Sequence, residues 1–151
     1  MTATQRLAEL DLPLPPPPQP AGAYTRAART GDLVFVAGQL PMADGKITCS
    51  GRVGAEVSLE EAQSAARLCA LNTLSILDAE VGIDQVTQIV RLTGFVCCTA
   101  DFTDQPKVVN GASDLMAEVF GPLGVHARLA VGSIALPLGA AVELEVIAQV
   151  Q

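Results

Sequence analysis

Residues 142–150 alternate between two sets of side chains, as in a β-strand with two different faces. One set is wholly apolar and consists of Val142, Leu144, Val146, Ala148 and Val150. The other set is of mixed polarity and consists of Glu143, Glu145, Ile147 and Gln149. Because successive side chains of a strand point to opposite faces, the first set predicts a face packed against helices. The chain is therefore expected to fold around a sheet whose two faces have different environments.

An early strand has a different pattern. Residues 33–37 are apolar at every position, which is typical of a strand covered on both faces. Gly31-Asp32 predicts the preceding turn, and Gly38 predicts an end or a bulge. A second turn at Asp44-Gly45 leads into a more polar strand at residues 46–49, so residues 33–49 are expected to form a hairpin.

Two helices are indicated by their end signals. Ser58-Leu59-Glu60-Glu61 is a capping box, and it opens an Ala- and Leu-rich run to residue 79 that stops near Gly82. Asp104-Gln105-Pro106 begins a second helix, which Gly121 ends.

Three more strands complete the expected order. Residues 86–98 are rich in β-branched side chains, and residues 127–133 and 141–150 form two strands joined by a turn at residues 137–139. The sequence predicts an α+β fold in the order β-β-α-β-α-β-β, with one mixed sheet and both helices on one of its faces.

The other face of this sheet also needs cover. Half of the residues are hydrophobic and only 17% are charged, which leaves little polar surface for a monomer. A mixed polar face that is nevertheless shielded indicates packing against further copies of the chain. We expect a closed homo-oligomer with carboxylates near its interfaces.

The N-terminal residues have a separate character. Residues 13–20 include six prolines and must be extended, whereas residues 1–12 could start a short amphipathic helix. We expect residues 1–21 to form a Pro-rich arm outside the core, and residues 22–151 to form one domain. A rigid lead-in to the first strand is favoured over a ligand for aromatic-lined modules.

Charge and composition disfavour several classes of partner. The net charge is −7, the nine basic residues are scattered, and one Tyr and four Phe are the only aromatics, so nucleic acid is not an expected partner. The sequence shows neither a signal-peptide pattern nor an apolar run of about twenty residues, so we expect a cytoplasmic protein that does not enter membranes.

Metals and other cofactors are not expected either. The lone His126 has no other His or Cys near it in the sequence, and no pair of cysteines has metal-ligand spacing. We expect reduced thiols at Cys49, Cys69, Cys97 and Cys98.

Arg128 is the most informative candidate for a binding residue. The predicted turn at residues 137–139 separates Arg128 from Glu143 and Glu145. We expect the segments on the two sides of this turn to form neighbouring strands. A guanidinium binds a planar anion through two parallel hydrogen bonds, so Arg128 suits a carboxylate ligand. The alternative is an Arg–Glu ion pair within a subunit contact.

The chain resembles the RidA family, also called the YjgF or L-PSP endoribonuclease-like family, from about residue 22 to residue 150, and it looks like a divergent subgroup. The motifs that carry the resemblance are Gly22-Ala23-Tyr24, Gly31-Asp32, Ala37-Gly38-Gln39-Leu40-Pro41, Phe95-Val96, Asp101-Phe102, Val109-Asn110, His126-Ala127-Arg128 and Val142-Glu143-Leu144-Glu145. The resemblance implies a chorismate-mutase-like fold and a homotrimer with three clefts between subunits.

The resemblance also implies roles for individual residues. Arg128 matches the residue that grips the substrate carboxylate, and Glu143 matches the carboxylate beside the attacking water. Tyr24 matches an aromatic that closes the cleft from the neighbouring subunit, Gly38 lines its floor, and Asn110 is a polar position near it. Without the resemblance, the last three are as readily a packing residue, a bulge and a helix-surface amide.

Two functions follow from these roles. The first is hydrolysis of a small 2-imino or enamino acid, such as 2-aminoacrylate, to a keto acid and ammonia. The second is a non-catalytic trimer that binds small keto acids or protein partners. It is favoured by Ala130, which stands where the family's deaminases often carry Cys. Endoribonuclease activity is disfavoured by the negative charge and the single His.

Overall fold

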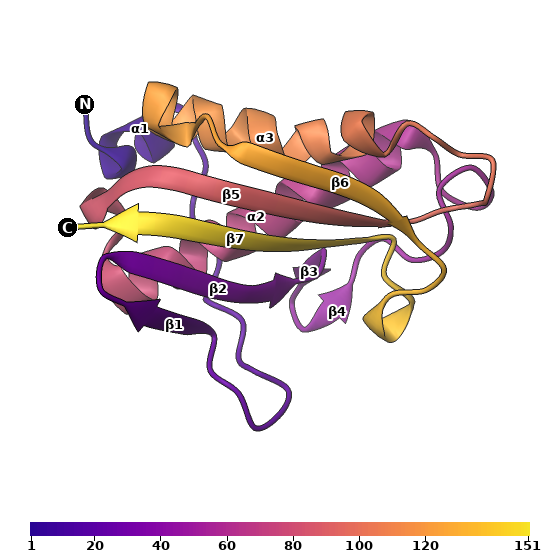
Figure 1. The fold of residues 1–151 in the computed structure, drawn as a ribbon, viewed down its shortest axis with the longest axis horizontal. Coiled ribbons are helices and arrows are strands. Elements are labelled where there is room, and N and C mark those ends of the chain that lie inside the picture. The colour runs from indigo at the N-terminus through magenta and orange to yellow at the C-terminus, as the bar shows by residue number, and fades with distance from the viewer.

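The computed structural model describes all 151 residues, and its main element is a five-stranded sheet (Figure 1). The strands lie in the order β1-β2-β7-β5-β6, and only the β5–β6 pair is parallel. Their bounds are Ala27–Thr30 for β1, Leu33–Gln39 for β2, Val86–Cys97 for β5, Ala127–Ser133 for β6 and Val142–Val150 for β7. The sheet is therefore mixed, as expected from the sequence.

Two long helices cover one face of this sheet. Helix α2, Leu59–Val81, packs on β2 and β7, and helix α3, Gln105–Phe120, packs on β5 and β6. Figure 1 views the sheet from the opposite side, with α2 behind the strands. The predicted α+β fold with both helices on one face is confirmed.

The helix ends lie where their signals predicted them. Ser58 and Glu61 exchange the two hydrogen bonds of a capping box, in which the Glu61 N–H donates to Ser58 Oγ at 3.1 Å. Gly82 and Gly121, which follow the two helices, adopt positive φ angles of 82° and 59°. Glycine tolerates that conformation without a Cβ clash, so both residues end their helices.

The predicted two-faced strand is confirmed by β7. Its apolar set is buried under the helices, whereas Glu143, Ile147 and Gln149 are partly exposed and Glu145 is exposed. Phe35 on β2 and Leu129 on β6 also lie on the uncovered face, and they are 42% and 44% exposed. Within a single chain this face has no cover.

The predicted hairpin over residues 33–49 is wrong. Strand β2 pairs with β1 and β7, and the turn at Asp44-Gly45 instead joins β3, Met42–Ala43, to β4, Lys46–Ile47, in a separate two-stranded ribbon. The sequence of β1 is Ala-Ala-Arg-Thr, which has few β-branched residues and no apolar alternation. It becomes a strand because the long β2 edge pairs with it.

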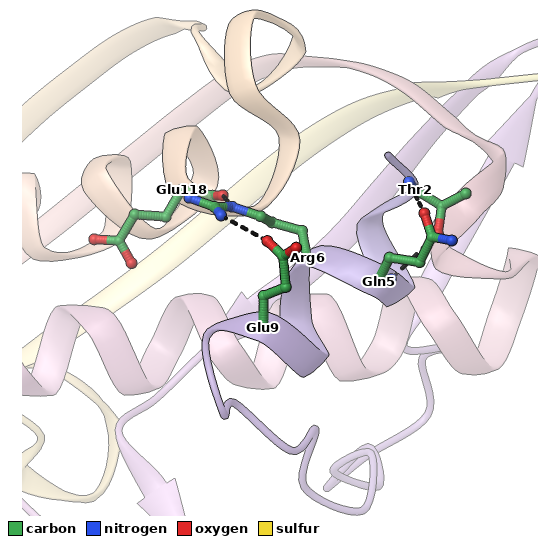
Figure 2. A network of polar contacts seen from close by, with 5 residues as sticks. All are labelled: Thr2, Gln5, Arg6, Glu9 and Glu118. Carbon is green, nitrogen blue, oxygen red and sulfur yellow. Dashed lines mark hydrogen bonds and ion pairs between the residues drawn. The ribbon is translucent and has the colours of Figure 1, made fainter.

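The N-terminal residues lie closer to the core than expected. Helix α1, Ala3–Glu9, buries Ala3 and Leu7 in the main hydrophobic cluster. Figure 2 shows the polar contacts around it: Arg6 Nε donates to the Glu118 carbonyl oxygen of α3 at 2.8 Å, and Arg6 also pairs with Glu9. The expectation that residues 1–21 lie wholly outside the core is therefore corrected for this helix.

Three short 3-10 helices connect the remaining elements, and they are η1 at Ile83–Gln85, η2 at Gly121–Gly124 and η3 at Pro137–Gly139. None of the helices has the length and the apolar character needed to cross a bilayer.

Candidate functional site

Arg128 lies on β6, the edge strand beside α3. Its register partner on β5 is Leu92, which is fully buried under the helices, so both side chains point to the helix-covered side of the sheet. The Arg128 Nη1 group donates to Asn110 Oδ1 at 2.7 Å and to Ser113 Oγ at 3.2 Å. Asn110 and Ser113 are three residues apart and share one face of α3. The structure therefore brings together two predicted site residues, Arg128 and Asn110.

His126 continues this network. Its Nδ1 atom is 2.6 Å from the Gly124 carbonyl oxygen, and its Nε2 atom is 3.0 Å from Ser113 Oγ. Because a carbonyl oxygen only accepts, the hydrogen-bond pattern assigns the proton to Nδ1 and leaves Nε2 to accept from the Ser113 hydroxyl. Ser113 thereby accepts from Arg128 and donates to His126, which fixes all three side chains.

The positive charge of Arg128 is not neutralised by its own chain. The four ion pairs of the structure involve other cations, and both partners of Arg128 are neutral oxygens. Its Nε and Nη2 groups have no protein partner, and together they form one edge of the guanidinium with two parallel N–H bonds. Arg128 lines an open hollow of about 350 Å³ together with His126, Asn110 and Ser113.

A second hollow contains the other three predicted site residues. Tyr24, Gly38 and Glu143 line a space of about 310 Å³ at the β1–β2–β7 side of the sheet. A Cβ atom at position 38 would lie 2.5 Å from Glu143 Oε1, so only glycine leaves room for the carboxylate in its observed place. The role of Gly38 as the floor of a cleft stays a prediction, and in this chain the Glu143 carboxylate occupies the space beside it.

The two hollows are separate within one chain. Strand β5 lies between β6 and β7, so the expectation that Arg128 and the glutamates occupy neighbouring strands is wrong. Arg128 pairs with Leu92 and points to the helix-covered face. Glu143 pairs with Phe95 and points to the uncovered face. The sheet itself therefore keeps the two functional groups of one chain apart.

Glu143 has the electrostatic properties of a proton acceptor. Partial burial raises the pKa of Glu143, and the negative charge of Glu145 on the same face adds to the effect. A carboxylate with a raised pKa is a stronger base than an exposed one when it is ionised. Such a group can take a proton from water and return it within one reaction cycle.

The raised pKa of Glu143 predicts a pH-dependent stability effect. The folded state disfavours the ionised carboxylate, so Glu143 costs stability above its folded pKa and nothing below its unfolded pKa, when both states are protonated. We expect Glu143→Gln to unfold at a higher temperature than the parent at pH 7.5. The difference should shrink as the pH falls toward about 4.

Thermal unfolding across this pH range measures the effect, and Glu145→Gln is the control on the same strand. Glu145 is exposed, so its replacement should shift the midpoint less. A larger shift for Glu145→Gln would contradict the burial explanation.

A larger hollow lies at another part of the fold. Its volume is about 690 Å³, and it lies between α1 and the end of α3. Arg6, which lines it, is already bound to Glu9 and to the Glu118 carbonyl oxygen (Figure 2). No group of three potential ligand side chains could hold a metal ion, and all four cysteines are free. The candidate site is therefore the pair of hollows around Arg128 and Glu143.

Sequence reasoning did not assign a role to Ser113. The only signal is its spacing of three from Asn110 in a predicted helix, which places both on one face. Its contact with His126 depends on how α3 packs beside β6, so it becomes visible only in the fold.

The fold and these two hollows define a class: small α+β proteins with an uncovered sheet face and an arginine without an ion pair on an edge strand. Comparison with known families identifies the class more closely. The chain belongs to the family described as "YjgF/chorismate mutase-like, putative endoribonuclease", which it matches over residues 4–150. The match begins before residue 22, where the sequence resemblance began, and includes all but the first residue of α1.

Three proteins illustrate this membership. Protein TCP17 of Trypanosoma cruzi is 42% identical over 145 residues, which cover 95% of this chain and 91% of that protein. The protein Atu1372 of Agrobacterium tumefaciens, of unknown function, is 40% identical with a TM-score of 0.92 and covers 99% of this chain and 92% of its own. A "putative endoribonuclease" of Shewanella oneidensis MR-1 is 30% identical with a TM-score of 0.94. The match covers 99% of this chain and 100% of that protein's chain.

Proposed function

We propose that this protein is a homotrimer that hydrolyses a small 2-imino or enamino acid to a keto acid and ammonia. In this proposal, the Arg128 hollow of one protomer faces the Glu143 hollow of the next, and each composite cleft holds one substrate. The observation that carries the proposal is the free Nε–Nη2 edge of Arg128. It offers two parallel donors to a carboxylate, and the chain supplies no anion for it.

The trimer accounts for two otherwise separate features. The uncovered face exposes large apolar side chains, including Phe35 and Leu129, which a second copy would bury. The same contact would bring Glu143 of one protomer close to the ligand held by Arg128 of the next, because Glu143 lies on the uncovered face. Three copies is the number that the family resemblance implies, and a closed ring satisfies every interface.

The chemistry assigns one task to each half-site. Arg128 holds the substrate carboxylate, while Asn110 and Ser113 fix the guanidinium. An enamino acid first tautomerises to the imine. Water adds to the carbon of the protonated imine as Glu143 takes one of its protons, which leaves a carbinolamine with a hydroxyl and an amino group. Glu143 returns that proton to the amino nitrogen, the C–N bond breaks to release ammonia, and the hydroxyl oxygen loses its proton to solvent as the keto group forms. No redox step or cofactor enters this sequence.

The second candidate function is a trimer that binds keto acids without turnover. Ala130 favours it, because it lies two residues after Arg128 on the same face and brings no reactive group to the cleft. Endoribonuclease activity, which the names of relatives mention, is opposed by the net charge of −7.

Ammonia release from freshly generated 2-aminoacrylate distinguishes the candidates. We expect the parent to accelerate release above the spontaneous rate, and we expect Glu143→Gln to lower this acceleration by about 100-fold, since general-base catalysis contributes that much or more. Glu145→Gln is the matched control and should retain most of the activity.

Binding of pyruvate, measured by calorimetry, completes the experiment. Binding without any acceleration by the parent would favour the non-catalytic trimer. Equal acceleration by the parent and Glu143→Gln would remove Glu143 from the mechanism.

A further inference from the structure

The Pro-rich segment, residues 13–20, forms one wall of the Glu143 hollow. Pro18, Gln19 and Pro20 line it directly, and residues 21 and 24 continue the wall toward β1. In Figure 1 the chain leaves α1, passes behind the sheet and makes a loop beyond β1 before it enters that strand. The arm therefore reaches the candidate site from a distant point of the fold.

This wall is attached to the rest of the fold at two points, and one local hydrogen bond lies within it. The Ser75 hydroxyl of α2 donates to the Pro15 carbonyl oxygen at 2.6 Å. Leu12 and Leu14 pack against the main core, and the Ala21 N–H donates to the Tyr24 hydroxyl at 3.2 Å. Prolines restrict the backbone between these points. A wall that is already ordered costs little entropy when a ligand packs against it.

The lining of this hollow beyond Glu143 is mainly apolar. Its apolar side chains include Pro18, Pro20, Ala21, Leu40, Met42 and Leu138. The one cation that lines it, Arg26, is bound to Glu80 through its Nε group at 2.9 Å. The hollow thus offers apolar contact next to the base but no free positive charge for a second acidic group.

The volume of the hollow exceeds what the smallest substrates need. At about 310 Å³ it lies at the lower end of the range that holds drug-sized ligands. A three-carbon imino acid would leave most of this space to water. A longer apolar side chain would displace that water and bury its surface against the prolines.

We propose that the Pro-rich segment builds a side-chain subsite that selects imino acids with bulky apolar side chains, of the leucine or phenylalanine type, over three-carbon ones. The inference rests on the proposed function, because it takes the carboxylate at Arg128 and the reacting carbon at Glu143 as fixed. The side chain of the substrate then extends from Glu143 toward Pro18, Pro20 and Leu138.

Binding of keto acids tests this subsite without requiring turnover. Calorimetry on the full-length protein would compare pyruvate with 4-methyl-2-oxopentanoate and phenylpyruvate. We expect the two bulky acids to bind more tightly than pyruvate by about 10-fold or more, since each buried methylene contributes about 0.8 kcal/mol. Pyruvate binding that is equal or tighter would overturn the proposal, and so would no binding by any of the three.

Two variants locate the preference in the arm. Ser75→Ala releases the Pro15 anchor, and Ala21→Trp fills the hollow, so each should bring the affinity ratio of phenylpyruvate to pyruvate down toward one. Ser64→Ala makes the same chemical change as Ser75→Ala on the same helix, at an exposed position that does not line this hollow, and it should keep the parent ratio. An unchanged ratio in both Ser75→Ala and Ala21→Trp would overturn the assignment to the arm.

The same ligands separate this inference from the proposed function. An amino acid oxidase would generate the imines of alanine, leucine and phenylalanine in the assay. The rate of ammonia release from each imine would then be measured with and without the protein. Tight binding of the bulky keto acids with no accelerated release supports the subsite and contradicts the deaminase. Accelerated release that is fastest for the alanine-derived imine supports the deaminase and contradicts the subsite.

Discussion

Arg128→Ala is expected to lower ammonia release by about 1,000-fold, because two hydrogen bonds to a charged carboxylate contribute about 3–6 kcal/mol together. Arg128 has no ion pair within its own chain, so its removal leaves no carboxylate stranded and should leave the fold intact. Arg128→Lys keeps the positive charge but loses the two parallel N–H donors of the guanidinium. Its rate of ammonia release should lie between those of the parent and of Arg128→Ala. Steady-state kinetics with matched unfolding curves would measure both effects.

Mixed trimers would show whether the site is shared between copies. Co-expression of Arg128→Ala with Glu143→Gln should restore about a quarter of the parent activity, since each cleft has an even chance of an intact arginine side and an even chance of an intact glutamate side. Each variant alone serves as the control. If both groups acted within one chain, every chain in the mixture would be defective, and no recovery would appear.

Gly111→Ala is expected to destabilise the protein by about 2 kcal/mol or more through overpacking. A Cβ atom at this position would lie 2.1 Å from the backbone oxygen of Gln63, so α3 would have to move away from α2. In an exposed helix the same substitution stabilises, typically by up to about 1 kcal/mol. The sign of the effect therefore reports on the contact between the two helices, and chemical denaturation measures it.

The control for Gly111→Ala is Asp114→Ala, at an exposed position of the same helix. It should change the free energy of unfolding little, because it touches neither α2 nor the core. A stabilising Gly111→Ala would mean that the helices are not packed as closely as the structure shows. Because Asn110 precedes Gly111, a displaced α3 should also weaken keto-acid binding at Arg128.

The elements that were predicted correctly have local sequence signals, such as a helix cap or an alternation of apolar and polar residues. The capping box at Ser58, the glycines at 82 and 121 and the alternation of β7 each identify an element within a few residues. Strand β1 has no such signal, since its pairing depends on β2 rather than on its own side chains. Helix α1 was predicted as an element, but its burial depends on a hydrophobic cluster formed by residues far along the chain.

The candidate site divides in the same way. The chemical type of Arg128 and its suitability for a carboxylate follow from the sequence, and so does the alternation that places Glu143 opposite the helix-packed face. The separation of these residues does not, because nothing in either segment indicates that β5 inserts between β6 and β7. The prolines beside Glu143 were also unpredicted, since a contact across more than 120 positions depends on the path of the whole arm.

The wall of the Glu143 hollow comes from residues 18–21 and from the η3 turn, both of which lie outside the five-stranded sheet. Changes in such connecting segments cost little folding energy, because the buried core does not pass through them. Proteins that share this scaffold could therefore diversify in the residues of this wall without a change in the sheet or the two long helices. The range of ligands that such proteins accept would then change through their connecting segments, while the arrangement of strands and helices stays the same.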